Sequence, residues 1–130
     1  MVHRITLRVY YEDTDLAGIV YYANYLRFIE RARTEWVRDL GIDQRALKAE
    51  TGQVFAVRSL EADYLRPAQF DDILSVETAP EAATPARLIL NQRVLRGDTA
   101  LFVARVTLVC LGESGRAVRF PAELRRRTGV

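Results

Sequence analysis

The sequence predicts an α+β fold in which one long helix packs across one antiparallel sheet. A strand-like stretch comes first, a long amphipathic helix follows it, and four further strand-like segments come after the helix. The chain has 130 residues, of which 49% are hydrophobic and 28% are charged, so it can build a core. We expect a single domain that spans residues 1–130.

The first strand is expected over residues 3–11. Apolar side chains such as Ile5 and Leu7 alternate there with polar ones, which is typical of a strand with one buried face. Residues 12–18 have the composition of a polar turn. Gly18 at its end can adopt a positive φ angle, or let another backbone or a ligand come close.

A long amphipathic helix is expected from Asn24 to Leu40. Asparagine is a common N-cap residue, and Gly41 is suited to end the helix. Burial of roughly six apolar side chains would contribute on the order of 10 kcal/mol as an upper value, so the helix should be central to the fold. The apolar residues at helical spacing are Tyr25, Phe28, Ile29, Ala32, Trp36 and Leu40.

The remaining chain is predicted to form a short helix and a series of strands. Asp43 can cap a helix over residues 44–50, which Gly52 would end. Residues 80–85 are rich in alanine and proline and are expected to form a connection, and a short basic helix is expected after Pro121. The strand-like segments are residues 54–66, 73–78, 87–96 and 99–111.

The composition argues against several classes of protein. The formal net charge of +2 is too small to indicate nucleic-acid binding. The only cysteine, Cys110, cannot form an internal disulfide, and no apolar run is long enough to span a membrane. We also find no signal-peptide pattern and expect a cytoplasmic protein. The only histidine, His3, leaves acid–base chemistry to carboxylates, tyrosines or backbone groups.

Two aspartates, Asp13 and Asp15, stand in the turn before the helix. The simplest interpretation is that both side chains accept hydrogen bonds within the turn. The spacing also begins like a calcium-binding loop, but Ala17 stands at its fifth position and Asn24 stands where a bidentate glutamate is needed. A third interpretation is catalytic, because a helix start offers unpaired N–H groups and the positive end of the helix dipole. The spacing by itself favours the first interpretation over the third.

The stretch from Tyr10 to Gly41 resembles the hotdog-fold acyl-CoA thioesterases. Its pattern, Y-x-D-x-D-x-x-G-x-V-Y-Y-x-N-Y before a helix with E-x-A-R, is similar to the hydroxybenzoyl-CoA thioesterases and to bacterial relatives encoded with the Tol–Pal system. The resemblance implies a hotdog fold, in which a curved antiparallel sheet wraps around one central helix, and hydrolysis of an acyl-CoA thioester. The matching residues are Tyr11, Asp13, Asp15, Gly18, Val20, Tyr21, Tyr22, Asn24, Tyr25, Glu30, Ala32 and Arg33, with Tyr64-Leu65-Arg66-Pro67-Ala68 also similar.

The resemblance implies that Asp15 is the catalytic carboxylate, either as a nucleophile that forms a mixed anhydride or as a base for water. It also implies that the backbone N–H of Tyr22 polarises the thioester carbonyl. A thiolate leaving group, with a pKa of about 8.5, needs little help from an acid. Many Tol–Pal-associated members carry histidine where this chain has Tyr22, whereas the hydroxybenzoyl-CoA type has tyrosine, so the branch does not assign the substrate.

Several other residues are candidates for substrate contact. The tyrosines could line an acyl pocket or belong to the core, and for Tyr25 we favour the core. Arginine suits the phosphates of coenzyme A, although most arginines here are expected to be surface charge. Glu30 and Glu35 are expected on a solvated helix face, and Cys110 as a small buried residue. The candidates are Gly18, Val20, Tyr21, Tyr25, Arg58, Arg66 and Arg87.

The resemblance also implies partners and alternatives. It implies a homodimer with the active site at the subunit interface, or a tetramer of two such dimers, and no metal or redox cofactor. The acyl group could be delivered by coenzyme A or by an acyl-carrier protein. One alternative is a hotdog protein that binds an acyl thioester without hydrolysing it. Another is a hotdog dehydratase, but those usually pair histidine with a carboxylate, and His3 lies outside the motif.

Overall fold

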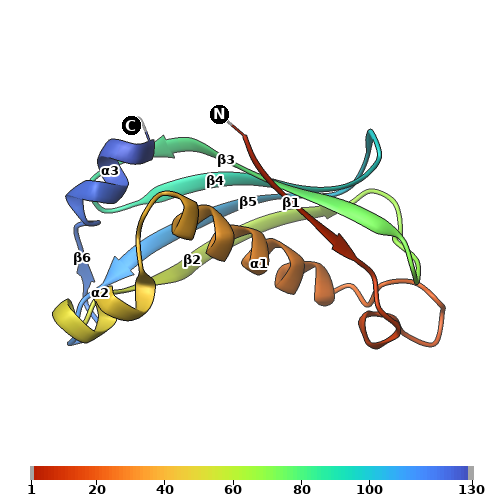
Figure 1. The fold of residues 1–130 in the computed structure, drawn as a ribbon, viewed down its shortest axis with the longest axis horizontal. Coiled ribbons are helices and arrows are strands. Elements are labelled where there is room, and N and C mark those ends of the chain that lie inside the picture. Colours follow the sequence, from red (N-terminus) through yellow and green to blue (C-terminus); the bar gives the residue numbers. More distant parts are fainter. Residues whose placement is uncertain (1, 129–130) are drawn as a thin grey trace.

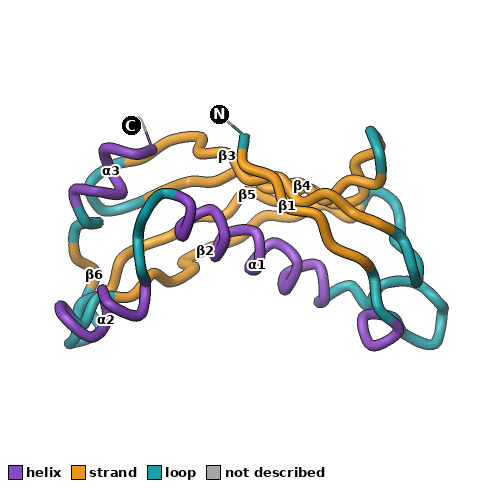
Figure 2. The backbone as a smooth tube through the Cα atoms, viewed as in Figure 1, coloured by secondary structure: helices purple, strands orange, loops and turns teal. Residues whose placement is uncertain are grey.

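The computed structural model describes residues 2–128. An antiparallel sheet arches over one side of the long helix α1 (Asn24–Asp39), as Figures 1 and 2 show. The predicted α+β arrangement, one helix across one curved antiparallel sheet, is confirmed. The strands are β1 (His3–Arg8), β2 (Val54–Tyr64), β3 (Ile73–Ala83), β4 (Leu88–Arg96), β5 (Thr99–Leu111) and β6 (Ala117–Val118).

The strands before and after the helical segment, β1 and β2, lie at opposite edges of the sheet. The order is β1-β3-β4-β5-β2, and every neighbouring pair is antiparallel. β6 pairs with β5 at Cys110. This position is two residues after Leu108, which pairs with Leu88 at the start of β4. Because β1 and β2 lie at opposite edges, the chain between them must cross the sheet, and it carries α1 across one face.

The core lies between α1 and the sheet. The apolar helix face is buried as predicted, apart from Leu40, which is half-buried, and Val37 and Arg33 are buried with it. Strand β5 buries Phe102, Ala104 and Val106 on alternate positions, as its sequence pattern predicts. The largest fully buried apolar side chains are Phe28, Ile29, Leu74, Leu88, Leu90, Leu101 and Phe102.

The helix starts where predicted, but Asn24 is not its cap. Asn24 is the first helical residue, and Ala23 occupies the N-cap position without a side-chain hydrogen bond. The Asn24 side chain instead donates to the carboxylate of Asp13. The N-cap prediction is therefore wrong, because Asn24 is already part of the helix and its side chain is turned toward Asp13.

Residues 80–83 also differ from the prediction. They belong to β3 and not to a connection, and the register with β4 shifts between Pro80 and Ala82. A proline cannot donate to a strand ladder, so it is tolerated where the pairing is irregular. The first strand, in turn, ends at Arg8, and a short 3-10 helix, η1 (Tyr11–Asp13), follows it.

The two short helices agree with the sequence prediction. In α2 (Gln44–Thr51) the Asp43 side chain accepts hydrogen bonds from the N–H groups of Arg45 and Ala46. Gly52 ends this helix with a φ angle of +74°. The helix α3 (Ala122–Thr128) follows Pro121, and Leu124 anchors it in the core.

A nearly buried carboxylate joins three strands on the face of the sheet that points away from α1. Glu77 of β3 lies between Arg4 of β1 and Arg93 of β4. Arg93 donates to Glu77 Oε1 from Nε at 3.0 Å and from Nη2 at 2.7 Å, and Arg4 donates to Oε2. Because the carboxylate is only 10% exposed, this cluster is screened less than a surface ion pair.

We expect the cluster to make the stability of the fold depend on pH. The hydrogen bond from Arg4 holds the pKa of Glu77 below its ordinary value of 4.5, and the bond from Arg93 adds to this against the opposing effect of burial. The stabilisation is then complete above the unfolded pKa and is lost as the pH falls through the lower pKa of the folded state. Urea unfolding between about pH 7 and pH 3 should show this loss, and Glu77→Gln should weaken the dependence. An unchanged pH dependence in that variant would contradict the assignment.

Candidate active site

The polar turn and the start of α1 form one hydrogen-bonded unit around Asp13. Asp13 is 6% exposed, and its carboxylate accepts a hydrogen bond from the Tyr10 N–H at 2.8 Å and from the Asn24 side chain at 2.6 Å. Its backbone carbonyl accepts the Tyr21 N–H at 2.9 Å. Asp13 therefore has the structural role that the simplest interpretation gave to both aspartates.

Asp15, by contrast, is exposed. Its Oδ1 accepts a hydrogen bond from the Ala17 N–H at 2.9 Å, and within residues 2–128 its Oδ2 has no partner. The Asp15 N–H donates to the Ile19 carbonyl at 3.0 Å, and the Gly18 N–H donates to the Asp15 carbonyl at 2.9 Å. Gly18 has a φ angle of +80° with open space where a Cβ would lie, so the turn needs glycine for its backbone conformation. The loop thus holds a carboxylate with one oxygen that no described residue contacts by a hydrogen bond.

One backbone donor, the N–H of Tyr22, stands close by in the chain, two residues before α1 begins. No acceptor within residues 2–128 pairs with the N–H of Tyr22. The carbonyl of Tyr22 accepts a hydrogen bond from the hydroxyl of Tyr64 at 2.9 Å. A helix start with free N–H groups favours negative charge, which is the property that the predicted role of Tyr22 requires.

An open, mainly apolar pocket of about 300 Å³ adjoins this helix start. Four predicted site residues line it: Val20, Tyr22, Tyr25 and Arg66. The complete lining is Ile19, Val20, Tyr22, Tyr25, Tyr64, Leu65, Arg66 and Pro67. A larger and more polar hollow, of about 590 Å³, lies between α1 and α2, but none of the predicted site residues line it.

The wall of the pocket is a cluster of aromatic rings. Tyr25 is buried and stacks on Phe102, with ring centroids 5.0 Å apart, and its hydroxyl accepts the Ala68 N–H at 2.9 Å. Tyr64 packs against both rings and against Tyr22. Burial is the main cause that raises the pKa of Tyr25 and of Tyr64, so both hydroxyls stay protonated at neutral pH.

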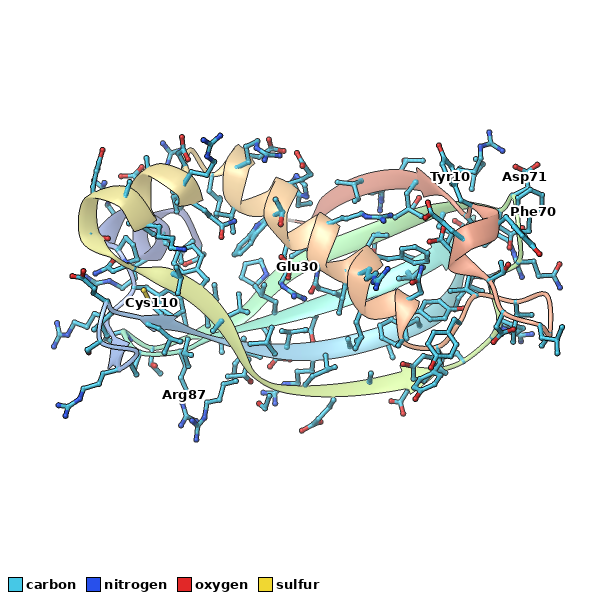
Figure 3. The ribbon with its side chains drawn as sticks, turned by 90° about the horizontal axis from the view of Figure 1, so that it is seen from below. Tyr10, Glu30, Phe70, Asp71, Arg87 and Cys110 are labelled. Carbon is cyan, nitrogen blue, oxygen red and sulfur yellow. The ribbon has the colours of Figure 1, made fainter. Side chains whose placement is uncertain are left out.

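The other candidate residues lie at different distances from the pocket. Tyr21 is exposed and packs its ring against Tyr22, with centroids 5.0 Å apart. Arg58 is exposed on β2 at a shift in register with β5, and it does not line the pocket. Figure 3 shows Arg87 near one end of the molecule, while Tyr10 and Asp71 lie near the other. Within one chain, only Arg66 of the three candidate arginines reaches the pocket.

The residues that we expected to be structural behave accordingly. Glu30 pairs with Arg33 and accepts a hydrogen bond from Thr34 on the same helix, and Glu35 pairs with Arg38. Cys110 is buried, and burial raises the pKa of its thiol, which disfavours the reactive thiolate.

Sequence reasoning missed Tyr64 as a site residue. It ends β2, 42 positions after Tyr22, whose carbonyl it contacts. The signal was its place in the segment Tyr64-Leu65-Arg66-Pro67-Ala68, which resembles the family but which alone gives no side-chain role.

The described residues also give two negative findings. In residues 2–128 no group of three or more His, Cys, Asp or Glu side chains is placed to hold a metal ion. None of the helices in this part of the chain is both long and apolar enough to cross a membrane.

Comparisons with known proteins decide the family. Residues 9–128 match the family model of the thioesterase-like superfamily. The chain belongs to this superfamily. An acyl-CoA thioesterase, YbgC, from Haemophilus influenzae is 43% identical over 92% of this chain and 88% of its own length. An acyl-CoA thioester hydrolase, also YbgC, from Escherichia coli is 42% identical over 83% of this chain and 81% of its own length.

Solved structures agree with the family. A probable thioesterase from Bartonella henselae has a TM-score of 0.90 and 36% identity, and the match covers 93% of this chain and all of that one. The predicted hotdog fold and the predicted enzyme class, a thioesterase, are therefore confirmed.

The hydrogen bond between Tyr64 and Tyr22 can be tested by Tyr64→Phe, which removes the hydroxyl and keeps the ring. We expect thiol release from the best thioester substrate to slow by about 10-fold, because the peptide next to the Tyr22 N–H loses its anchor. The free energy of unfolding should fall by only about 1 kcal/mol. Tyr11→Phe is the matched control, since that hydroxyl is exposed and has no partner within residues 2–128. Equal rates for Tyr64→Phe and the native protein would show that the bond has no role in the reaction.

Proposed function

We propose that this thioesterase hydrolyses an acyl-CoA thioester to a carboxylic acid and free coenzyme A. The observation that carries the proposal is the exposed carboxylate of Asp15, one oxygen of which has no partner within residues 2–128. It stands on a loop closed against Ile19, a residue of the apolar pocket. Such a pocket suits an acyl group, and a carboxylate next to it suits attack on the carbonyl. The Haemophilus and Escherichia relatives, an acyl-CoA thioesterase and an acyl-CoA thioester hydrolase, support acyl-CoA as the substrate class.

Asp15 would act in one of two ways. As a nucleophile, its oxygen bonds to the acyl carbon, the carbon–sulfur bond breaks, and coenzyme A leaves as a thiolate. Water then cleaves the mixed anhydride and restores the carboxylate. As a general base, Asp15 instead takes a proton from the water that attacks the same carbon. Both routes consume one water and give the same products.

The Tyr22 N–H would stabilise the negative charge that develops on the carbonyl oxygen. Support comes from its unpaired state within residues 2–128 and from its place at the positive end of the α1 dipole. A fixed backbone donor needs little reorganisation during the reaction, which is why such groups stabilise oxyanions well. This use of a backbone group fits a chain whose only histidine, His3, pairs with Asp39.

The acyl group would lie in the apolar pocket, against Val20, Tyr25 and Tyr64, with Tyr21 beside its rim. The lining carries few polar groups, so it favours apolar acyl chains or rings. Arg66 is the pocket arginine suited to the phosphates of coenzyme A. An acyl-carrier protein remains an alternative donor, and a comparison of the two thioesters in the same assay would separate them.

We further propose a homodimer, or a tetramer of two dimers, with the active site at the subunit interface. β2 is an edge strand of 11 residues that exposes Val57 and Leu60, and long apolar edges are usually covered. A second copy would cover this edge and could bring Arg58 or Arg87 to a site that they do not reach within one chain. We also propose that residues 1–130 act as one domain and that the protein is cytoplasmic, which its buried free thiol fits.

The assembly can be tested by placing charge on the β2 edge. Val57→Lys with Leu60→Lys should lower the mass measured by light scattering and should reduce thiol release, because the site would lose its interface. Val2→Lys is the matched control, an exposed apolar residue next to the opposite edge strand, β1. If the β2 variant keeps the native mass, or if only the control variant dissociates, the interface lies elsewhere.

The proposed reaction can be tested with Asp15→Asn, which keeps the shape of the side chain and removes its charge. We expect kcat for thiol release from a panel of acyl-CoA esters to fall on the order of 10³-fold or more. Asp98→Asn, an exposed aspartate in the β4–β5 hairpin, should keep native activity. Full activity of Asp15→Asn would overturn the mechanism. If the native protein binds an ester but releases no thiol, the non-catalytic binding protein becomes the better account.

A further inference from the structure

We propose that Asp13 and Asn24 form a positioning pair that sets the geometry between the Asp15 carboxylate and the Tyr22 N–H. The inference rests on the proposed function and adds two residues to the same site. Neither side chain lines the apolar pocket, so the pair would act on the reaction through the residues that it holds.

The pair is a buried carboxylate whose two oxygens are both used. The Asn24 side chain donates to Oδ1 at 2.6 Å, and the Tyr10 N–H donates to Oδ2 at 2.8 Å. Asp13 and Asn24 are 6% and 8% exposed. None of the salt bridges within residues 2–128 involves Asp13, so these two donors hold the carboxylate without help from a cation. Loss of either donor would leave a buried acceptor unsatisfied.

The bond joins the two halves of the candidate site. Asp13 stands two residues before Asp15, and Asn24 stands two residues after Tyr22. Backbone contacts join the same two segments. The Tyr21 N–H donates to the Asp13 carbonyl, and Thr14 forms an isolated β-bridge with Val20. The side-chain pair therefore braces the closed loop against the first turn of α1. A displacement of about 1 Å between reacting groups can cost about 100-fold in rate, so this brace matters to the reaction.

The test replaces Asn24, the donor of the pair, by aspartate, whose ionised carboxylate can only accept hydrogen bonds. In Asn24→Asp two carboxyl groups meet where the native distance is 2.6 Å, so they hold together only while they share a proton. We expect kcat to stay near the native value in mild acid and to fall by about 100-fold as the proton is lost between about pH 5 and pH 8, with a smaller change in KM. The double variant Asp13→Asn with Asn24→Asp exchanges donor and acceptor, and it should restore both the rate and the native pH profile.

Controls separate positioning from folding. Leu124→Ala removes a buried apolar side chain of α3 that lies outside the pocket lining, so it should lower Tm and leave kcat unchanged. All rates are compared below the unfolding temperature of each variant, with circular dichroism at each pH. If Asn24→Asp unfolds at high pH, Asn24→Ala supplies the comparison, with an expected loss in kcat of about 10-fold at nearly constant KM.

Three results would overturn the pair. They are a native kcat for folded Asn24→Asp at every pH, a native kcat for Asn24→Ala, or a folded double variant that stays impaired. These outcomes are distinct from failure of the proposed function. Asp15→Asn leaves both members of the pair in place, so its full activity would reject the role of Asp15 whatever the pair variants show.

Discussion

The burial of α1 against the sheet determines where every part of the candidate site lies. Phe28, Ile29 and Ala32 are almost fully removed from solvent, so the helix cannot roll or shift without losing apolar contact. Apolar packing alone does not fix how the helix is oriented on the sheet, but the directional hydrogen bonds of a buried glutamine do. Gln92 of β4 donates to the Ile29 carbonyl at 2.9 Å and accepts a hydrogen bond from Arg33 at 2.8 Å. Such a polar connection inside a core fixes one arrangement of helix on sheet.

With the helix fixed, its N-terminus meets two separate segments. The turn before it supplies a carboxylate that is held by the turn's own backbone. The segment after β2 supplies an aromatic wall, with Tyr64 bonded to the Tyr22 carbonyl. The two aspartates differ because one is buried and the other exposed. Both oxygens of Asp13 accept hydrogen bonds, whereas one oxygen of Asp15 has no partner within the described part of the chain. An exposed group with a free oxygen can meet a substrate, and a buried, saturated one can only hold other residues in place.

The sequence was informative wherever a pattern is local. Helical spacing located α1 to within a residue at its C-terminal end, and alternation located β5, because both periods follow directly from backbone geometry. The failures involve partners distant in the chain. The true partner of Asn24 is 11 residues away in a turn, Pro80 lies in β3 because β4 pairs with it, and Tyr64 reaches a carbonyl 42 residues earlier. The family pattern pointed to Asp15 and Tyr22 and includes Arg66, whereas Arg58 and Arg87 lie outside it and do not line the pocket within one chain.

The origin of the pocket wall has an evolutionary consequence. The chemistry is proposed to reside in the turn and helix start, whereas half of the pocket lining comes from residues 64–67, on a segment with its own strand and loop. Substitutions at residues 65–67 keep the hydrogen bond from Tyr64 to the Tyr22 carbonyl. They can reshape the space offered to an acyl group and leave the carboxylate and the backbone donor where they are. Descendants of one ancestral enzyme could therefore have acquired new acyl preferences by drift in a single short segment, with the reacting groups inherited unchanged.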